Sequence, residues 1–177
     1  MLPVMETQGR DPLIAFYREG ARDDRGRTLA EMLAWDDERL EDVHDFIQWL
    51  FPLPEPSGAT PAAPVLDSET MAAFHSTPVM RERLRQAFDR MLRFYGLRWN
   101  GAVVERAEDF RERAKNWLWP GNHNHLRLTR MLRSTLLPGL EIESAGLFRA
   151  LNAIYREYPH RISLRTHAFW SDTSQTG

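Results

Sequence analysis

Residues 77–96, TPVMRERLRQAFDRMLRFYG, carry the clearest structural pattern in the chain. Apolar side chains recur there every three or four residues and would share one face of a helix, namely Met80, Leu84, Ala87, Phe88, Met91 and Tyr95. Thr77 followed by Pro78 is a typical helix start, and Gly96 can take the left-handed conformation that often ends a helix. The stretch therefore predicts an amphipathic α-helix over residues 78–95, about 27 Å long.

The same three-four spacing, bounded by capping residues, prolines and glycines, recurs on both sides of this stretch. We expect further helices over residues 13–17, 28–35, 36–51, 67–74, 105–118, 122–137, 144–158 and 162–170. The five prolines of residues 52–64 predict a surface loop, and residues 96–104 predict a loop with a brief extended piece at 102–104. The fold class is therefore all-α, a single-domain, irregular or orthogonal bundle of about eight helices.

Apolar residues in four of these helices should pack into one core. The predicted core comprises Leu40, Val43, Ile47, Leu50, Leu84, Phe88, Met91, Leu128, Met131, Leu132, Phe148, Leu151 and Ile154. A chain of 177 residues fits one domain better than two. We place that domain at residues 11–170 and expect flexible ends at 1–10 and 171–177.

Composition excludes several kinds of chemistry and location. The chain has no Cys, which removes disulfides, thiol catalysis and thiolate metal sites. Its N-terminus has no basic patch followed by an apolar run, and no apolar stretch approaches the roughly 20 residues that span a bilayer. We therefore expect a soluble, cytoplasmic protein with no signal peptide and no transmembrane segment.

Charge is unevenly distributed along the chain. Residues 1–80 hold 6 Arg and 15 Asp or Glu, whereas residues 81–133 hold 13 Arg or Lys and 6 Asp or Glu. Such asymmetry can indicate an anionic partner. Alternatively, the two parts face each other in the fold and neutralise each other.

The best candidate for a binding site is the start of the helix predicted at residues 122–137. A helix start presents free backbone amides and the positive end of the helix dipole, which together favour an anion. Arg127 and Arg130 lie three residues apart, on one face, and a guanidinium suits a carboxylate or a phosphate. Asn122, His123 and Asn124 would add further donors. The sequence thus predicts an anion site formed by these five residues.

Structural alternatives exist for each candidate residue. The two arginines can pair with the acidic segment 36–45, and the asparagines can simply cap the helix. His44 lies beside the apolar face of its predicted helix, either as a base or ligand or as a packed imidazole bonded to a carbonyl. Trp49 is either a binding platform or a core residue. His123 and His125 could ligate a metal, but residues two apart do not share a helix face, and no third ligand is near.

Other classes of function have little support in the sequence. There is no Gly-rich phosphate loop, no G-x-S-x-G and no spaced carboxylate cluster, so no catalytic residue is predicted. We expect no metal and no cofactor. Nucleic-acid binding is disfavoured by the sequence pI of about 6.3 and by the lack of a recognisable DNA- or RNA-binding motif.

Three sequence blocks resemble the conserved region of the opioid growth factor receptor family. They are WDDERLEDVHDFIQWLFPLPEP (35–56), FDRMLRFYGL (88–97) and NWLWPGNHNHLRLTRML (116–132). The most specific pieces are IQWLFP (47–52) and HNHLRLTRMLRS (123–134). The resemblance covers roughly residues 11–170 and departs from the family pattern at His125, where that pattern carries Asn.

The resemblance implies a receptor-like role. Animal members of that family are described as receptors for an enkephalin peptide that regulate cell growth at the nuclear envelope and in the nucleus, and they are unrelated to seven-helix opioid receptors. Larger members carry repeat-containing tails, which residues 1–177 lack. We therefore expect a non-enzymatic helical module that binds a short peptide. The alternatives are an enzyme acting on a phosphate- or carboxylate-bearing small molecule at the Asn122–Arg130 surface and, third, an Arg-mediated nucleic-acid binder.

Overall fold

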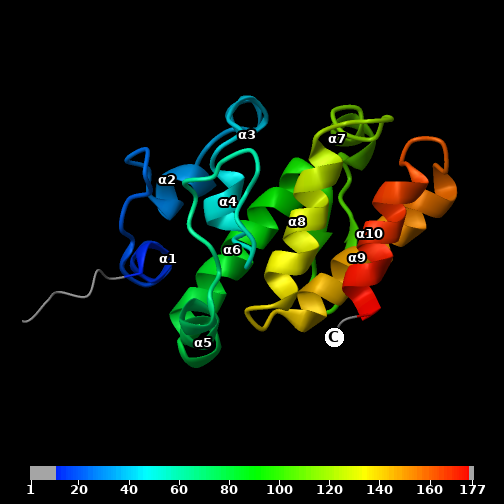
Figure 1. Cartoon of the computed structure of the whole chain (residues 1–177). Coiled ribbons are helices and arrows are strands. Elements are labelled where there is room, and N and C mark those ends of the chain that lie inside the picture. Colours follow the sequence, from blue (N-terminus) through cyan, green and yellow to red (C-terminus); the bar gives the residue numbers. More distant parts are fainter. Residues whose placement is uncertain (1–10, 176–177) are drawn as a thin grey trace, which may run out of the picture.

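The computed structural model describes residues 11–175. Within them the chain forms ten α-helices, one π-helical turn and one two-stranded sheet (Figure 1). The elements are α1 Pro12–Ile14, η1 Ala15–Glu19 (the π-helical turn), α2 Leu29–Leu33, α3 Asp37–Asp42, α4 Ile47–Leu50, α5 Ser68–Ser76, α6 Pro78–Phe94, β1 Leu97–Trp99, β2 Val104–Arg106, α7 Phe110–Ala114, α8 Asn124–Leu136, α9 Glu141–Glu157 and α10 Leu164–Gln175. The expected helical, single-domain fold is confirmed, although the described residues contain more and shorter helices than predicted.

Helix α6 lies at the centre of the fold. The whole inner face predicted for it is buried, from Met80 to Tyr95. It contacts η1, α2 and α5 on one side and α8 on the other (Figure 1). Helix α8 in turn packs against α9 and α10. Gly96, with a φ of 75°, follows the helix end as its sequence position predicted.

The prediction of one helix over residues 36–51 was wrong, because two short helices, α3 and α4, form there instead. Val43 ends α3 in an extended conformation, with φ −89° and ψ 126°. The guanidinium of Arg127, on α8, donates to the carbonyls of Leu40 and Val43, both at 2.9 Å. In a continuous helix those carbonyls would bond to amides of the next turn, so here a distant side chain satisfies them instead. The break removes His44 from any helix.

Residues 97–106 also differ from the prediction. They form a β-hairpin in which Leu97 faces Arg106, where a loop and the start of a helix were expected. Only Val104 of the expected extended piece at 102–104 lies in a strand. The ring of Trp99 lies against Gly146 on α9, close enough that a Cβ added there would meet it at 3.0 Å. Packing on a distant helix thus stabilises a hairpin that the local pattern did not indicate.

The predicted core is confirmed. Eleven of its thirteen members are buried, and Val43 and Phe148 are partly buried and pack against them. Helix α10 extends past Trp170, where the sequence predicted its end, so residues 171–175 are helical rather than a frayed tail. Trp170 is fully buried, and its indole donates to Thr129 Oγ1 on α8 at 3.0 Å. The predicted flexible end at 1–10 lies outside the described residues.

Candidate functional site

A cavity of about 850 Å³ opens between α8, α10 and the segment 44–59. Its exposed lining is mostly apolar and comes from all three parts, namely Ile47, Leu53, Leu126, Leu136, Leu137 and Phe169. Leu126 and Phe169 are both exposed at its edge. Arg127, Arg130 and Arg133 belong to the α8 wall of the cavity. This combination suits a ligand that has apolar groups and a negative charge.

Arg127 contributes to the fold around this cavity. Only 5% of its surface is exposed, and besides the two carbonyls it contacts Asn124 Oδ1 at 3.3 Å. Glu41 lies 3.9 Å from its guanidinium. The predicted alternative, pairing with the acidic segment 36–45, therefore describes the place of Arg127 correctly, but backbone carbonyls are its main partners.

Arg130 is held differently. Its Nε donates to the carbonyl of Phe51 at 2.7 Å, at the end of α4. Burial and the nearby Arg133 lower the pKa of Arg130 to about 10, while Glu55 opposes this. The side chain therefore stays charged at neutral pH. No described residue accepts a hydrogen bond from its terminal nitrogens.

Arg133, one turn further along α8, has a carboxylate partner. Its guanidinium contacts Glu55 at 2.6 Å, and both side chains are more than a third exposed. An exposed pair of this kind is worth at most about 1 kcal/mol. Because that contact is weak, a ligand carboxylate can compete with Glu55 for Arg133.

The predicted free amides at the start of α8 are not free, which corrects the sequence-based picture of the anion site. The amide of Asn124 donates to Asn122 Oδ1 at 2.8 Å, and the amide of His125 donates to the Asn122 carbonyl at 3.1 Å. The amide of Leu126 donates to the His123 carbonyl, also at 3.1 Å. Asn122 itself is buried. An anion at this helix end would have to displace its own capping residues.

Asn124 is likewise part of the interior. It has no exposed surface, and its Nδ2 donates to Glu41 Oε2 at 3.0 Å. Its Oδ1 accepts from the Tyr95 hydroxyl at 3.3 Å. The side chain thus joins α3, α6 and α8, which positions the cavity wall rather than facing a ligand.

His123 and His44 stand together at the edge of the cavity. Nε2 of His123 lies 2.9 Å from Glu41 Oε1, and the two imidazole rings meet edge to face with centroids 5.4 Å apart. Partial burial lowers the pKa of His123, with Arg127 and His44 adding to that effect and Glu41 opposing it. His44 is exposed and lines the cavity. The structure thus brings these two candidates together.

His125 and Trp49 lie away from the cavity. His125 is buried with Nε2 2.9 Å from the Trp117 carbonyl, and burial lowers its pKa. Trp49 is buried, and its indole donates to Asp24 Oδ1 at 3.1 Å. The alternative that Trp49 is a core residue is therefore correct, and His125 is also a residue of the interior. A departure from the family pattern at His125 thus affects packing against Trp117 rather than the cavity lining.

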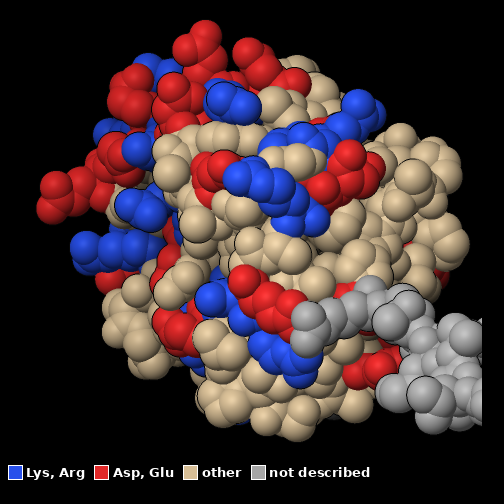
Figure 2. All heavy atoms as spheres, turned by 90° about the vertical axis from the view of Figure 1, so that its left-hand side faces the viewer, with Lys and Arg blue, Asp and Glu red and all other residues tan. Residues whose placement is uncertain are grey.

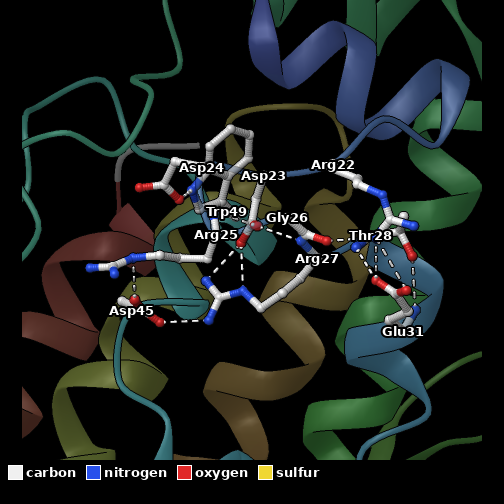
Figure 3. A network of polar contacts seen from close by, with 10 residues as sticks. All are labelled: Arg22, Asp23, Asp24, Arg25, Gly26, Arg27, Thr28, Glu31, Asp45 and Trp49. Carbon is white, nitrogen blue, oxygen red and sulfur yellow. Dashed lines mark hydrogen bonds and ion pairs between the residues drawn. The ribbon is translucent and has the colours of Figure 1, made fainter.

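A polar network fixes the segment that carries His44 (Figure 3). Arg27 contacts Asp23 at 2.6 Å and Asp45 at 2.7 Å, and Arg25 contacts Asp45 from the other side at 3.3 Å. The bond between Trp49 and Asp24 lies in the same network (Figure 3). These contacts tie the loop before α2 to the segment between α3 and α4, so this wall of the cavity is pre-positioned.

The uneven charge of the sequence is largely paired in the fold. Arg90 on α6 contacts Asp37 at 2.9 Å, and Arg113 on α7 contacts the other oxygen of the same carboxylate. Figure 2 shows basic and acidic side chains interspersed over one face of the molecule. Mutual neutralisation, one of the two predicted explanations, therefore accounts for much of the asymmetry.

Gln48 and Arg133 are among the cavity residues that sequence reasoning missed. Gln48 is buried, and its Oε1 has no hydrogen-bond partner among the described residues. A polar residue inside the apolar run IQWLF was the available signal. Arg133 was visible as a third arginine at three-residue spacing after Arg127 and Arg130. The α10 wall with Phe169 had no sequence signal, because it depends on how the last helix packs.

The described residues contain neither a cluster of metal ligands nor a membrane-spanning helix. Residues 11–175 contain no group of three or more His, Asp or Glu side chains placed to hold a metal ion. In the same range, no helix has the length and apolar character needed to cross a membrane.

Comparison with known proteins identifies the family. Residues 16–151 match the family described as the opioid growth factor receptor (OGFr) conserved region. The chain belongs to this family. The human opioid growth factor receptor is 38% identical over 151 residues, which cover 81% of this chain and 22% of that protein. The rat opioid growth factor receptor is 41% identical over 144 residues, covering 77% of this chain and 24% of that protein.

A second group of relatives carries a related name. Opioid growth factor receptor-like protein 1 of Xenopus tropicalis is 39% identical over 101 residues, 56% of this chain and 19% of that protein. The chain thus spans about a fifth to a quarter of the length of these relatives. No solved structure matches the chain. The match to the family's conserved region ends at residue 151, within α9, so α10, which forms one cavity wall, lies beyond that match.

Proposed function

We propose that this chain is a non-enzymatic binding module whose cavity between α8, α10 and the segment 44–59 holds a short peptide. The observation that carries the proposal is the cavity of about 850 Å³, mostly apolar in lining, in which Arg130 offers a charge that no described carboxylate bonds. Pockets for small ligands generally measure roughly 300–1,000 Å³ and combine apolar walls with a few polar groups. The relatives' name, a receptor for an opioid growth factor, supports a peptide over an inorganic anion.

The anion site of this proposal centres on Arg130, with Arg133 beside it. Arg127, Asn122 and Asn124 act as positioning residues, because their polar groups already have partners inside the fold. His123 stands at the cavity edge, within reach of a bound ligand. The proposal thus keeps the five residues of the anion site predicted from the sequence but assigns them different roles.

Thermal melts of three proteins test this function. The parent, Arg130→Gln and the control Arg149→Gln are compared with and without phosphate, nucleotides and a pool of short peptides. Arg149 lies exposed on α9, away from the cavity. We expect peptides to raise the midpoint of the parent and the control but not of Arg130→Gln. The proposal fails if no peptide stabilises the parent, or if Arg130→Gln responds as the parent does.

A second function, catalysis, has one observation in its favour. The pair formed by Glu41 and His123 at 2.9 Å resembles a carboxylate that orients an imidazole for use as a general base. Mass spectrometry of each stabilising peptide after long incubation distinguishes the two functions. Binding predicts that the peptide is recovered intact, whereas turnover that disappears in His123→Gln would establish the enzyme.

A further inference from the structure

We propose, building on the peptide-binding function above, that the cavity recognises the free carboxyl terminus of its peptide, with an apolar last side chain. A peptide end of this kind would satisfy three features of the cavity at once. They are a cation whose terminal nitrogens bond to no described residue, an apolar wall beside it, and a buried acceptor that receives no hydrogen bond from residues 11–175.

The cation is Arg130. Its Nε–H is engaged by the Phe51 carbonyl at 2.7 Å, which fixes the plane of the guanidinium. Its terminal nitrogens donate to no described residue, and the carboxylate of Glu55 contacts Arg133 at 2.6 Å. Asp172, on α10, also lines the cavity. A planar guanidinium held this way suits a carboxylate, which it can bind through two parallel bonds.

The apolar wall lies on the same helix face as the cation. Leu126 precedes Arg130 by four residues, and Leu136 and Leu137 follow Arg133 by three and four, so each lies about one turn from a guanidinium. A carboxylate at Arg130 therefore has Leu126 within one turn, while Leu136 and Leu137, six and seven residues further along α8, lie about two turns away on the other side. This favours a carboxylate that is covalently close to an apolar side chain, as at the end of a peptide.

The acceptor is Gln48, on α4. It is 5% exposed and lines the cavity. Within the part of the chain that the structure describes, its Oε1 has no hydrogen-bond partner, and its Nε2 makes a long contact of 3.5 Å to Ser57 Oγ. The last torsion of a Gln side chain is soft, so a small rotation can turn the oxygen to a ligand. Gln48 lies three residues before Phe51, whose carbonyl accepts from Arg130, so the acceptor and the group that holds the cation come from the same segment. The backbone N–H next to a terminal carboxylate is a donor of the kind that this oxygen lacks among the described residues.

These features separate a peptide end from other anions. Inorganic phosphate has no apolar group and no N–H for Gln48. An acidic side chain inside a longer peptide brings a carboxylate, but its backbone must continue through the cavity in both directions. Capture of a terminal carboxylate is a known way in which proteins bind peptides.

Two peptide libraries test the inference. Both contain heptapeptides in which each of the last three positions is varied over all amino acids. The peptides of one library end in a free carboxyl group and those of the other in a carboxamide. Each is passed over the immobilised chain, and retained peptides are identified by mass spectrometry. We expect enrichment from the free-acid library only, with Leu, Ile, Met, Val or Phe at the last position.

The possible outcomes separate the two proposals. Equal enrichment from the carboxamide library, or an enriched internal Asp or Glu without preference at the last position, overturns the terminal-carboxylate inference and leaves peptide binding intact. No enrichment from either library overturns both. For one enriched peptide, replacing the carboxylate by a carboxamide should weaken binding by about tenfold or more, the effect of losing a charge-assisted bond.

Variants supply an independent readout. Arg130→Gln should reduce the affinity for the free acid to the level of the carboxamide, and Gln48→Leu should weaken binding of both forms. Arg149→Gln should leave both affinities unchanged. If Arg130→Gln does not fold, the NMR signal of the Arg130 Nε–H in the parent serves instead. A shift of that signal with the acid and not with the carboxamide supports the inference, and no shift with either contradicts it.

Discussion

Replacing Arg127 by Met removes the guanidinium that holds α3 and α4 in place while keeping much of the apolar stem. The two carbonyls of Leu40 and Val43 then lose donors at 2.9 Å. A hydrogen bond that involves a charged group contributes roughly 1.5–3 kcal/mol, so the loss amounts to about 3–6 kcal/mol. Part of it is offset because the buried guanidinium no longer has to be desolvated. We therefore expect Arg127→Met to lower the free energy of unfolding by about 3 kcal/mol.

Urea denaturation followed by tryptophan fluorescence measures this loss. With a slope of about 2 kcal/mol/M, the midpoint should fall by about 1.5 M. The matched control is Arg133→Met, on the same helix, which loses only the exposed contact to Glu55 and should cost less than about 1 kcal/mol. An exposed ion pair contributes at most about 1 kcal/mol. If the free energy of unfolding of Arg127→Met differs from that of the parent by less than about this amount, the structural role of Arg127 is refuted.

Three further predictions concern stability. Leu132→Ala, at a fully buried position, should cost about 2–5 kcal/mol in the same assay, and a cost below that range would contradict the packed core. Burial raises the pKa of Asp89, so the folded state holds its proton more tightly than the unfolded state, and stability should fall as pH rises through that raised pKa. Asp89→Asn should therefore raise the melting midpoint at pH 7 but not near pH 3, and an equal effect at both pH values would contradict this. Chelators should leave the melting midpoint unchanged, and a drop would indicate a bound metal.

The sequence predicted elements whose cause is local. The three-four pattern from Met80 to Tyr95 defines α6 because one continuous face of that helix is buried. The helix expected over residues 28–35 begins at a capping box of Thr28 and Glu31, with both hydrogen bonds present. These features need only residues within one or two turns of each other.

Elements whose cause is distant were not predicted. The break between α3 and α4 depends on Arg127, whose partner Leu40 is 87 residues away. The hairpin of β1 and β2 depends on packing against α9, which periodicity cannot reveal. Both errors follow from hydrogen bonds and contacts that a window of neighbouring residues does not contain.

The candidate site was predicted in part for the same reason. Arg127 and Arg130 were identified from helix spacing and His123 as a further donor, and all three line the cavity. Their roles could not be assigned, because Asn122 covers the amides that a helix start would otherwise offer. The opposing walls, with Gln48 on α4 and Phe169 on α10, become visible only when the helices are packed.

The most direct test of the central claim is a ¹H–¹⁵N NMR titration of the labelled chain with a peptide enriched from the free-acid library. If the cavity is the binding site, the shifted signals should come from α8, α10 and the segment 44–59, together with the Arg130 Nε–H. Shifts confined to the β1–β2 hairpin or to the surface around Arg90 and Asp37, or an unchanged spectrum at saturating peptide, would contradict the account.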